Sequence, residues 1–273
     1  AISAKRNKVP IFHMEAGNRC FDQRVPEEIN RKIVDHLSDI NMTISEHARN
    51  YLVSEGIRSE TIIKIGSSMK EVLDINAAKI QESKVLESEE LYPNKYLLVS
   101  LHREENLDSE ENFKNFLETI EALEENYEMP IIISTHPRTK KRLDKIGYEN
   151  TSSLIRFTKP FGFHDYVKLQ MEAFCVISDS GTITEEASIL NLPAITVRDA
   201  HERPEGMDEG VLIMSGLKKD DVIRSIEEIT TNHEGQKSEA LIVKDYDSLN
   251  VSKKVLRIIL SYTNYVNRLT WHK

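Results

Sequence analysis

Short apolar runs alternate with segments of helical periodicity along most of this chain, and this alternation limits the possible folds more than any other feature. The apolar runs expected to form strands are Pro10–Met14, Met42–Ser45, Ile62–Ile65, Tyr96–Leu101, Ile131–Ser134, Leu154–Phe157, Phe174–Ser178 and Ala194–Val197. The segments expected to form helices include Pro26–Leu37, Glu46–Ser54, Met69–Ile80, Ser109–Glu125, Thr182–Leu190, Lys218–Thr230 and Val251–Tyr265. Strands that alternate with helices build βαβ units. The sequence therefore predicts an α/β protein with parallel sheets covered by helices, and it contains no internal repeat.

The composition narrows the class of partner. The net charge of -9, with no stripe of Lys and Arg, argues against a nucleic-acid binder. The two cysteines, Cys20 and Cys175, have neither metal-ligand nor disulfide spacing, which favours a reducing cytoplasm. No apolar run approaches the roughly 20 residues of a spanning helix, so no membrane partner is expected. We expect a cytoplasmic protein that acts on a small molecule.

The length of 273 residues allows one large or two small domains. The polar, acidic segment Ile80–Asn94 indicates a boundary just before it. We expect residues 1–68, with about 251–273, to form one domain and residues 69–250 another. The chain opens on small residues followed by Lys5, Arg6 and Lys8, and such cations are typical of a helix C-terminus. We therefore expect the chain to begin inside a helix, and its first domain to be truncated.

The stretch "MEAGNRCFDQRVPEE" places many ionisable groups around one proline. Pro26 suits the first position of a helix, and Glu27 and Glu28 suit its first turn, so ordinary helix-start chemistry explains both glutamates. It does not explain Glu15, Arg19 and Asp22, which follow the first expected strand. Ligands of open α/β sheets bind at this end of the strands. The stretch is a candidate catalytic loop.

Two further strands also end in basic residues. In "VSLHREEN" an apolar strand leads directly into His102 and Arg103, and "STHPRTKKR" repeats the arrangement with His136 and Arg138. A lone histidine is usually structural. One that ends a buried parallel strand beside an arginine is a better candidate for acid/base or phosphate chemistry.

The segment "CVISDSGTITEEASIL" delivers Ser180, Gly181 and Thr182 to the start of a helix. Exposed N–H groups and the helix dipole make such a terminus a binding site for anions, and glycine lets the backbone approach a phosphate. Glu185 or Glu186 is placed to accept hydrogen bonds from a ribose diol. The alternative is a serine cap on an ordinary helix.

The segment "RDAHERPEG" follows the next strand and supplies Arg198 and Arg203 as further candidate phosphate ligands. The chain contains neither GxGxxG nor GxxxxGK[ST], so dinucleotide and P-loop chemistry lose support. These motifs together indicate two Rossmann-like domains, with acids on the first and a nucleotide-phosphate site on the second.

The blocks "HMEAGNRCFDQRVPEEINR", "HREEN" and "SDSGTITEEASIL…RDAHERPEG" resemble the non-hydrolysing UDP-N-acetylglucosamine 2-epimerases, in the order in which that family has them. The resemblance runs over essentially the whole chain and implies two Rossmann-like domains of GT-B type. "GNRCFDQRVPEE", "STHPRT" and the final segment are most similar to the branch that makes UDP-N-acetyl-L-fucosamine from a UDP-2-acetamido-2,6-dideoxy-L-talose precursor for capsule or O-antigen.

The resemblance also assigns roles. It implies that Glu15, Glu27 and His102 are catalytic. The residues implied to bind UDP are Tyr166 beside the uracil, Ser180 and Gly181 at phosphate, Glu186 at the ribose and Arg203 at the pyrophosphate. The further candidate contacts to substrate or phosphate are Arg19, Arg103, His136 and Arg198.

The family's reaction eliminates UDP across C1–C2 to give a 2-acetamidoglycal and adds UDP back with the proton delivered to the other face. The resemblance implies no cofactor and no metal, a UDP-sugar as the small-molecule partner, and a homodimer for the full-length form. The family's opening "VGTRPE" loop and its later "GD[ST]" aspartate do not occur in this chain. We therefore expect these residues alone to be inactive.

Three alternatives stay open from the sequence. The first is UDP-N-acetylglucosamine 2-epimerase itself. The second is a GT-B glycosyltransferase, because that fold shares the helix-terminal UDP site. The third is an inactive fragment that only binds UDP.

Overall fold

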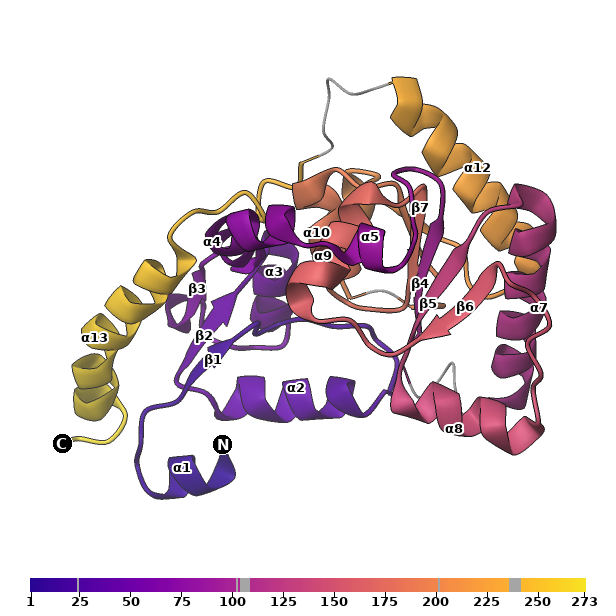
Figure 1. The fold of residues 1–273 in the computed structure, drawn as a ribbon. Coiled ribbons are helices and arrows are strands. Elements are labelled where there is room, and N and C mark those ends of the chain that lie inside the picture. The colour runs from indigo at the N-terminus through magenta and orange to yellow at the C-terminus, as the bar shows by residue number, and fades with distance from the viewer. Residues whose placement is uncertain (24, 102, 104–108, 201, 236–241) are drawn as a thin grey trace. The chain divides into compact units, whose positions relative to one another are not determined.

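A computed structural model describes residues 1–23, 25–101, 103, 109–200, 202–235 and 242–273 (Figure 1). The chain forms two compact units. Unit 1 comprises Ala1–Asp74, Glu202–Asp208 and Ile242–Lys273, and unit 2 comprises Ile75–His201 and Glu209–Leu241. Compared with the predicted domain of residues 1–68 and about 251–273, unit 1 also includes residues 69–74, 202–208 and 242–250.

Unit 1 is built on a three-stranded parallel sheet in the order β1-β2-β3. Its strands are β1 (Phe12–Met14), β2 (Ile40–Thr43) and β3 (Ile62–Lys64). Its helical elements are α1 (Ile2–Arg6), α2 (Pro26–Leu37), α3 (Glu46–Ser54), η1 (Ser59–Thr61), α11 (Pro204–Asp208) and α13 (Val251–Leu269), and α4 (Met69–Glu82) begins in it.

The core of unit 1 joins the sheet to the last helix. Ile40 and Met42 of β2 pack with Ile65, Val251 and Val266 in one buried cluster. The two valines lie on the buried face of α13, whose apolar residues recur at helical spacing. The sheet of unit 1 therefore depends on a helix that comes from the far end of the sequence.

Unit 2 contains a six-stranded sheet in the order β6-β5-β4-β7-β8-β9, with every neighbouring pair parallel. Its strands are β4 (Leu97–Leu101), β5 (Ile131–Thr135), β6 (Ile155–Thr158), β7 (Cys175–Ser178), β8 (Ala194–Thr196) and β9 (Ile213–Met214). Its helices are α5 (Val85–Ser88), α7 (Glu110–Tyr127), α8 (Pro137–Ile146), α9 (Phe163–Glu172), α10 (Ile183–Leu190) and α12 (Lys219–Gly235). The predicted α/β class with parallel sheets is confirmed.

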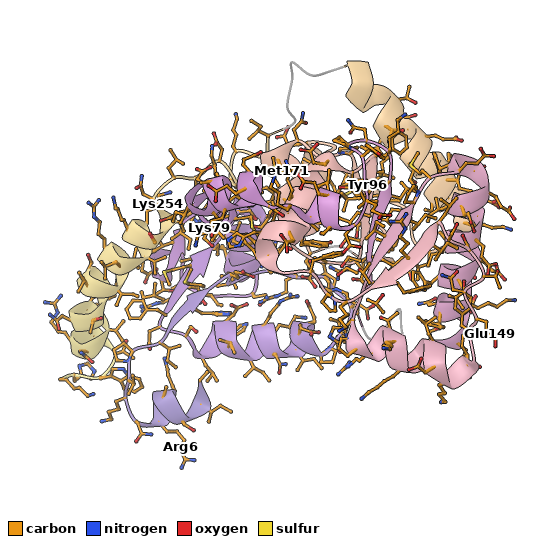
Figure 2. All side chains as sticks on the ribbon, viewed as in Figure 1. Arg6, Lys79, Tyr96, Glu149, Met171 and Lys254 are labelled. Atoms are coloured by element: carbon orange, nitrogen blue, oxygen red, sulfur yellow. The ribbon has the colours of Figure 1, made fainter. Side chains whose placement is uncertain are left out.

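The central strands of unit 2 are buried on both faces, which explains their nearly continuous apolar sequence. One face packs against α7 and α12, which run side by side (Figure 1). Tyr96 is fully buried and its hydroxyl donates to the carbonyl of Leu169 at 2.6 Å, whereas Glu149 projects from the surface (Figure 2). Burial raises the pKa of the Tyr96 phenol far above its ordinary value.

Candidate functional site

The strand order of unit 2 creates a switch point between β4 and β7. Successive strands are added from β4 towards one edge and from β7 towards the other. Open α/β sheets bind ligands at the carboxyl ends of the strands where the order reverses. Arg103 follows β4, and Asp179, Ser180 and Gly181 follow β7. Several of the predicted site residues therefore lie where this fold places a ligand.

Asp179 ties the ends of these two strands together. Its carboxylate accepts a hydrogen bond from the backbone N–H of Arg103 at 3.0 Å, and its carbonyl accepts from Arg103 Nε at 3.0 Å. The Asp179 side chain is completely buried. This aspartate stands directly before the Ser180-Gly181 pair and was not among the residues predicted for the site. Asp179 sets the backbone at the switch point.

The start of α10 differs from an ordinary serine-capped helix. The N-cap residue is Thr182, and its side chain makes no capping hydrogen bond. Ser180 Oγ accepts from Thr182 N at 3.3 Å and lies 3.0 Å from Thr182 Oγ1. Ser180 and Gly181 thus form a turn in front of the positive end of α10. Such a turn suits a phosphate group.

Glu186 lies one turn into α10 and is held by two donors. Thr182 Oγ1 donates to Oε1 at 2.9 Å, and Gln170 Nε2 donates to Oε2 at 2.6 Å. Burial raises the pKa of Glu186, against the lowering effect of these two hydrogen bonds. Each carboxylate oxygen can accept a further hydrogen bond. The side chain therefore has a fixed orientation and acceptor capacity that suits a diol.

Tyr166 of α9 also belongs to the switch point. Burial raises the pKa of its phenol to about 12, and hydrogen bonds from the Ser100 and Ser178 side chains oppose that shift. The charges of Glu186 and Asp179 add to it. Tyr166 is therefore grouped with the ends of β4 and β7 and with Glu186.

Two basic residues of unit 2 occupy other positions. Arg198 follows β8 and is buried. His136 is the N-cap of α8, and its Nδ1 accepts from Arg138 N at 3.3 Å. This contact gives His136 a helix-capping role that the sequence interpretation did not include.

In unit 1, Glu15 directly follows β1 and adopts a left-handed backbone conformation with φ 55°. Its side chain is 64% exposed, and its Oε2 lies 3.7 Å from Arg203 Nη2.

The adjacent glutamates of α2 have different environments. Glu27 is exposed, whereas Glu28 is fully buried and accepts a hydrogen bond from Cys20 N at 2.9 Å. Glu28 therefore has a structural role, whereas Glu27 is an exposed glutamate in the first turn of α2.

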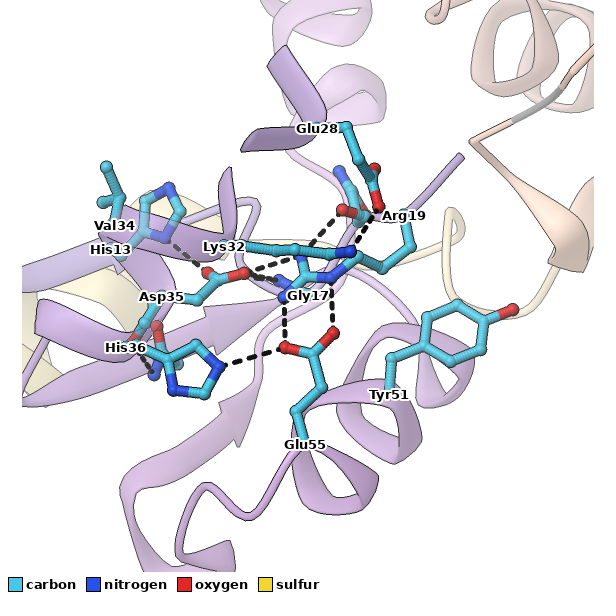
Figure 3. A network of polar contacts seen from close by, with 12 residues as sticks. His13, Gly17, Arg19, Glu28, Lys32, Val34, Asp35, His36, Tyr51 and Glu55 are labelled. Carbon is cyan, nitrogen blue, oxygen red and sulfur yellow. Dashed lines mark hydrogen bonds and ion pairs between the residues drawn. The ribbon is translucent and has the colours of Figure 1, made fainter. Parts of the chain in front are cut away.

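Arg19 lies in a buried network (Figure 3). Its Nε and Nη2 donate to the two carboxylate oxygens of Glu55 at 2.8 and 2.7 Å, and its Nη1 lies 2.7 Å from Asp35 Oδ2. Burial alone would lower the pKa of Arg19, but these carboxylates outweigh it and raise the pKa. The sequence analysis predicted Arg19 as a possible contact to substrate or phosphate, and the structure places its guanidinium between Asp35 and Glu55. Its donors are used inside unit 1.

The segment 202–208 is anchored in unit 1 by side chains of helices and of the C-terminal region. Glu202 pairs with Arg31 at 2.8 Å, Glu205 accepts from the Tyr246 hydroxyl at 2.8 Å, and Asp208 lies 2.6 Å from His47. Arg203, which was expected with the domain of residues 69–250, therefore lies in unit 1 beside Glu15.

The predicted catalytic His102 lies outside the described residues. Within the described part of the chain, no group of His, Cys, Asp or Glu side chains is arranged to hold a metal ion. No helix there is both long and apolar enough to cross a membrane.

Comparison with known proteins gives a consistent result. A family model described as UDP-N-acetylglucosamine 2-epimerase matches residues 1–260. A curated UDP-N-acetylglucosamine 2-epimerase of Methanocaldococcus jannaschii is 36% identical over 239 residues, which are 83% of this chain and 64% of that protein. The chain therefore spans less than two thirds of this relative. A UDP-2,3-diacetamido-2,3-dideoxy-D-glucuronate 2-epimerase of Pseudomonas aeruginosa is 30% identical over 82% of this chain and 62% of its own length.

Solved structures show the same likeness. UDP-N-acetylglucosamine 2-epimerase from Rickettsia bellii superimposes with a TM-score of 0.93 and 56% identity, over 100% of this chain and 72% of that one. The M. jannaschii enzyme in complex with UDP-GlcNAc and UDP superimposes with a TM-score of 0.83 and 32% identity, over 95% and 71% of the two chains. These likenesses confirm the GT-B type of fold.

Proposed function

The chain belongs to the UDP-N-acetylglucosamine 2-epimerase family, and from this premise we propose that the protein epimerises a UDP-linked 2-acetamido sugar at C2. The observation that carries the proposal is the pairing of Glu15 with Arg203. An exposed carboxylate after a parallel strand stands 3.7 Å from a buried guanidinium, so a group that moves protons adjoins one that binds phosphate.

The UDP moiety binds mainly through unit 2 in this proposal. Ser180 and Gly181 hold phosphate at the start of α10, Glu186 accepts from the ribose hydroxyls, and Tyr166 lies beside the uracil. Arg103 and Arg198 are the further phosphate candidates of this unit. Support comes from the position of Arg103, Ser180 and Gly181 at the switch point and from the start of α10, where the N-cap side chain makes no capping hydrogen bond.

Arg203 is the proposed pyrophosphate ligand. Its side chain is only 5% exposed, so an anion beside it is screened little by water. Glu15 lies 3.7 Å from Arg203, so its negative charge repels a pyrophosphate group bound to the arginine. When Glu15 takes up the C2 proton, this repulsion is removed. Proton transfer to Glu15 therefore favours the departure of UDP from the sugar.

The proposed reaction removes the C2 proton and breaks the C1–oxygen bond. The C2–H electron pair forms the C1=C2 double bond of a 2-acetamidoglycal, and UDP leaves with the electrons of the C1–O bond. Re-addition of UDP at C1 and delivery of a proton to the opposite face of C2 complete the exchange. Glu15 and Glu27 are the proposed acid/base groups. His102 is proposed to stabilise the departing phosphate.

Two substrates are candidates. UDP-N-acetylglucosamine is the substrate in the names of the M. jannaschii and R. bellii proteins, and we propose it first. The second is UDP-2-acetamido-2,6-dideoxy-L-talose, with UDP-N-acetyl-L-fucosamine as product. The motif "GNRCFDQRVPEE", with its resemblance to that branch, favours this second substrate.

The test is solvent deuterium exchange. Because residues 1–273 alone are expected to be inactive, the test uses a form that also carries the family's "VGTRPE" loop and "GD[ST]" aspartate. This protein is incubated with each sugar nucleotide in D2O, and deuterium at C2 of the sugar is followed by NMR. We expect it, as the wild type of the tests below, to incorporate deuterium into one of the two sugars. Glu15→Gln and Glu27→Gln should lower the rate by about 100-fold or more, in the range known for acid/base groups.

The matched control is Glu110→Gln, since Glu110 is also an exposed glutamate in the first turn of a helix. This variant should keep the wild-type rate. Absence of deuterium at C2 with both sugars would refute the proposed reaction. Transfer of the sugar to an added acceptor, without such exchange, would favour a glycosyltransferase.

A further inference from the structure

Asp35 is a buried carboxylate at the centre of the network in Figure 3, and its partners come from the segment that carries Glu15. Its Oδ1 lies 2.7 Å from His13 Nδ1, and its Oδ2 lies 2.7 Å from Arg19 Nη1. The backbone N–H of Gly17 donates to both oxygens at 3.3 Å. The Asp35 side chain has no exposure to solvent.

These contacts bracket Glu15 in the sequence. His13 lies two positions before it, Gly17 lies two positions after it, and Arg19 lies farther along the same loop. Between the contacts, the loop is fixed to the sheet by the N–H of Ala16, which donates to the carbonyl of Met42 at 3.2 Å. Asp35 therefore connects the strand, the turn and the loop that surround Glu15.

The backbone around Glu15 depends on such support. Glu15 has φ 55°, a left-handed conformation that non-glycine residues adopt only when their surroundings impose it. Gly17 has φ 81°, and a Cβ there would lie 2.3 Å from the Ala48 carbonyl oxygen. Gly17 therefore packs closely against α3, where a larger residue would clash with the backbone. Glu15 adopts a backbone conformation that non-glycine residues rarely adopt.

A second carboxylate reinforces the arrangement. Glu55 receives two parallel hydrogen bonds from Arg19 and lies 3.2 Å from His36 Nε2. Arg19 therefore cannot turn away from Asp35 without losing its pairing with Glu55. The guanidinium is fixed between two carboxylates, and the loop is fixed with it.

We propose that Asp35 is a positioning residue for the C2 chemistry, holding the backbone that aims the Glu15 carboxylate. This inference rests on the proposed function. Asp35 touches neither substrate nor reacting atoms. It acts through His13, Gly17 and Arg19, and the quantity that it controls is the orientation of Glu15.

The first test compares Asp35→Asn with Asp39→Asn. Asp39 is also a buried carboxylate that accepts from a backbone N–H, that of Ile11 at 2.9 Å, and from a cation, Lys5 at 2.6 Å. It supports the residues before β1 and not the loop after it. We expect Asp35→Asn to lower kcat by about 10–100-fold, the range expected when a reacting group is misplaced by about 1 Å.

The KM for the sugar nucleotide should stay within about threefold, because Glu15 acts in proton transfer and not in ground-state binding. Asp39→Asn should leave both constants near wild type. Equal effects of the two variants on kcat would show that only general stability is involved, and would overturn the inference.

The second test reads the loop directly, without substrate. Amide hydrogen exchange at residues 15–19 should be faster in Asp35→Asn than in wild type and unchanged in Asp39→Asn. If wild-type protein exchanges no deuterium at C2, the proposed function fails, and the role of Asp35 in that chemistry fails with it. If wild-type protein is active and Asp35→Asn shows unchanged hydrogen exchange at residues 15–19, the inference about Asp35 is overturned while the proposed function stands.

A milder pair of variants covers the case in which Asp35→Asn does not fold. His13→Ala removes one of the three anchors, whereas His13→Asn keeps an N–H donor near the position of Nδ1. We expect a lower kcat and faster exchange at residues 15–19 in the first variant, with recovery of both in the second. The same kcat in His13→Ala and wild type would contradict the proposal.

Discussion

Arg203 and Glu15 are far apart in the sequence but adjacent in unit 1, with Nη2 of the arginine 3.7 Å from Oε2 of the glutamate. The arginine is almost fully buried, whereas the glutamate is mostly exposed. The cation is shielded from water, whereas the anion faces the solvent. A phosphate that reaches Arg203 therefore changes the electrostatic environment of Glu15 directly.

Replacement of Arg203 by alanine should weaken UDP binding by about 1–3 kcal/mol, the usual cost of losing a charge-assisted hydrogen bond. Calorimetric titration with UDP measures the change. Arg224→Ala is the control, because Arg224 is exposed and pairs only weakly, at 3.7 Å, with Asp221. Equal UDP affinity in wild type and Arg203→Ala would exclude Arg203 as a phosphate ligand.

Glu186 should confer a preference for ribose over deoxyribose. Wild-type protein should bind UDP more tightly than 2′-deoxy-UDP, by about 1.5–3 kcal/mol if the ribose hydroxyl donates to the carboxylate. In Glu186→Gln this difference should shrink. Glu172→Gln, in which the lost carboxylate pairs with Lys168 on α9, should keep it. A preference that survives in Glu186→Gln would place the ribose elsewhere.

The two adjacent glutamates of α2 should differ in their effect on stability. Glu28→Ala leaves the buried N–H of Cys20 without its acceptor, so the free energy of unfolding should fall by about 1–3 kcal/mol. Glu27→Ala alters an exposed position and should change it by no more than about 0.5 kcal/mol. Urea denaturation compares the variants. Equal losses would contradict the structural assignment of Glu28.

The pairing of Glu55 with Arg19 should make stability depend on pH. The hydrogen bond from Arg19 lowers the pKa of Glu55 below its ordinary value. A carboxyl group with a lowered pKa stabilises the fold above its unfolded pKa of about 4.3, and this contribution is lost as the pH falls through the folded value. Wild type should therefore be more stable than Glu55→Gln at pH 7, and the difference should shrink below about pH 4.3.

Thermal unfolding at pH 7 and pH 3 tests this expectation. The control is Glu60→Gln, which removes an exposed carboxylate that pairs with the exposed Arg58 at 3.1 Å. That variant should follow wild type at both pH values. A constant difference between wild type and Glu55→Gln from pH 7 to pH 3 would show that the Glu55 charge does not stabilise the fold.

Local sequence signals predicted the elements that begin and end on characteristic residues. Helix α2 starts at Pro26 in the first position, and α3 follows Ser45, whose side chain accepts from Ala48 N. The expected helices did not include α8 and α9. Helix α8 is mostly charged and buries only Thr139 and Leu143, so it offers few apolar residues from which to predict a helix. Helix α9 follows Gly162, which offers no capping side chain.

The candidate site was predicted less completely than the fold. Residues at or just after strand ends, such as Glu15, Ser180 and Gly181, could be proposed from the sequence because the carboxyl ends of parallel strands gather ligands. The placement of Arg203 in unit 1 and the burial of Arg19 were not found. Both depend on contacts between segments distant in the sequence, and no local pattern marks such contacts.

The packing of α13 on the sheet of unit 1 has a consequence for the order of events on the ribosome. At about 5–20 residues per second, on the order of 10–40 s pass between the synthesis of β3 and that of α13. During that interval Ile40 and Met42 lack the valines of α13 that complete their cluster. The strands of unit 2 are all made within the same interval. Unit 2 can therefore complete its sheet while the apolar side chains of Ile40 and Met42 still await α13.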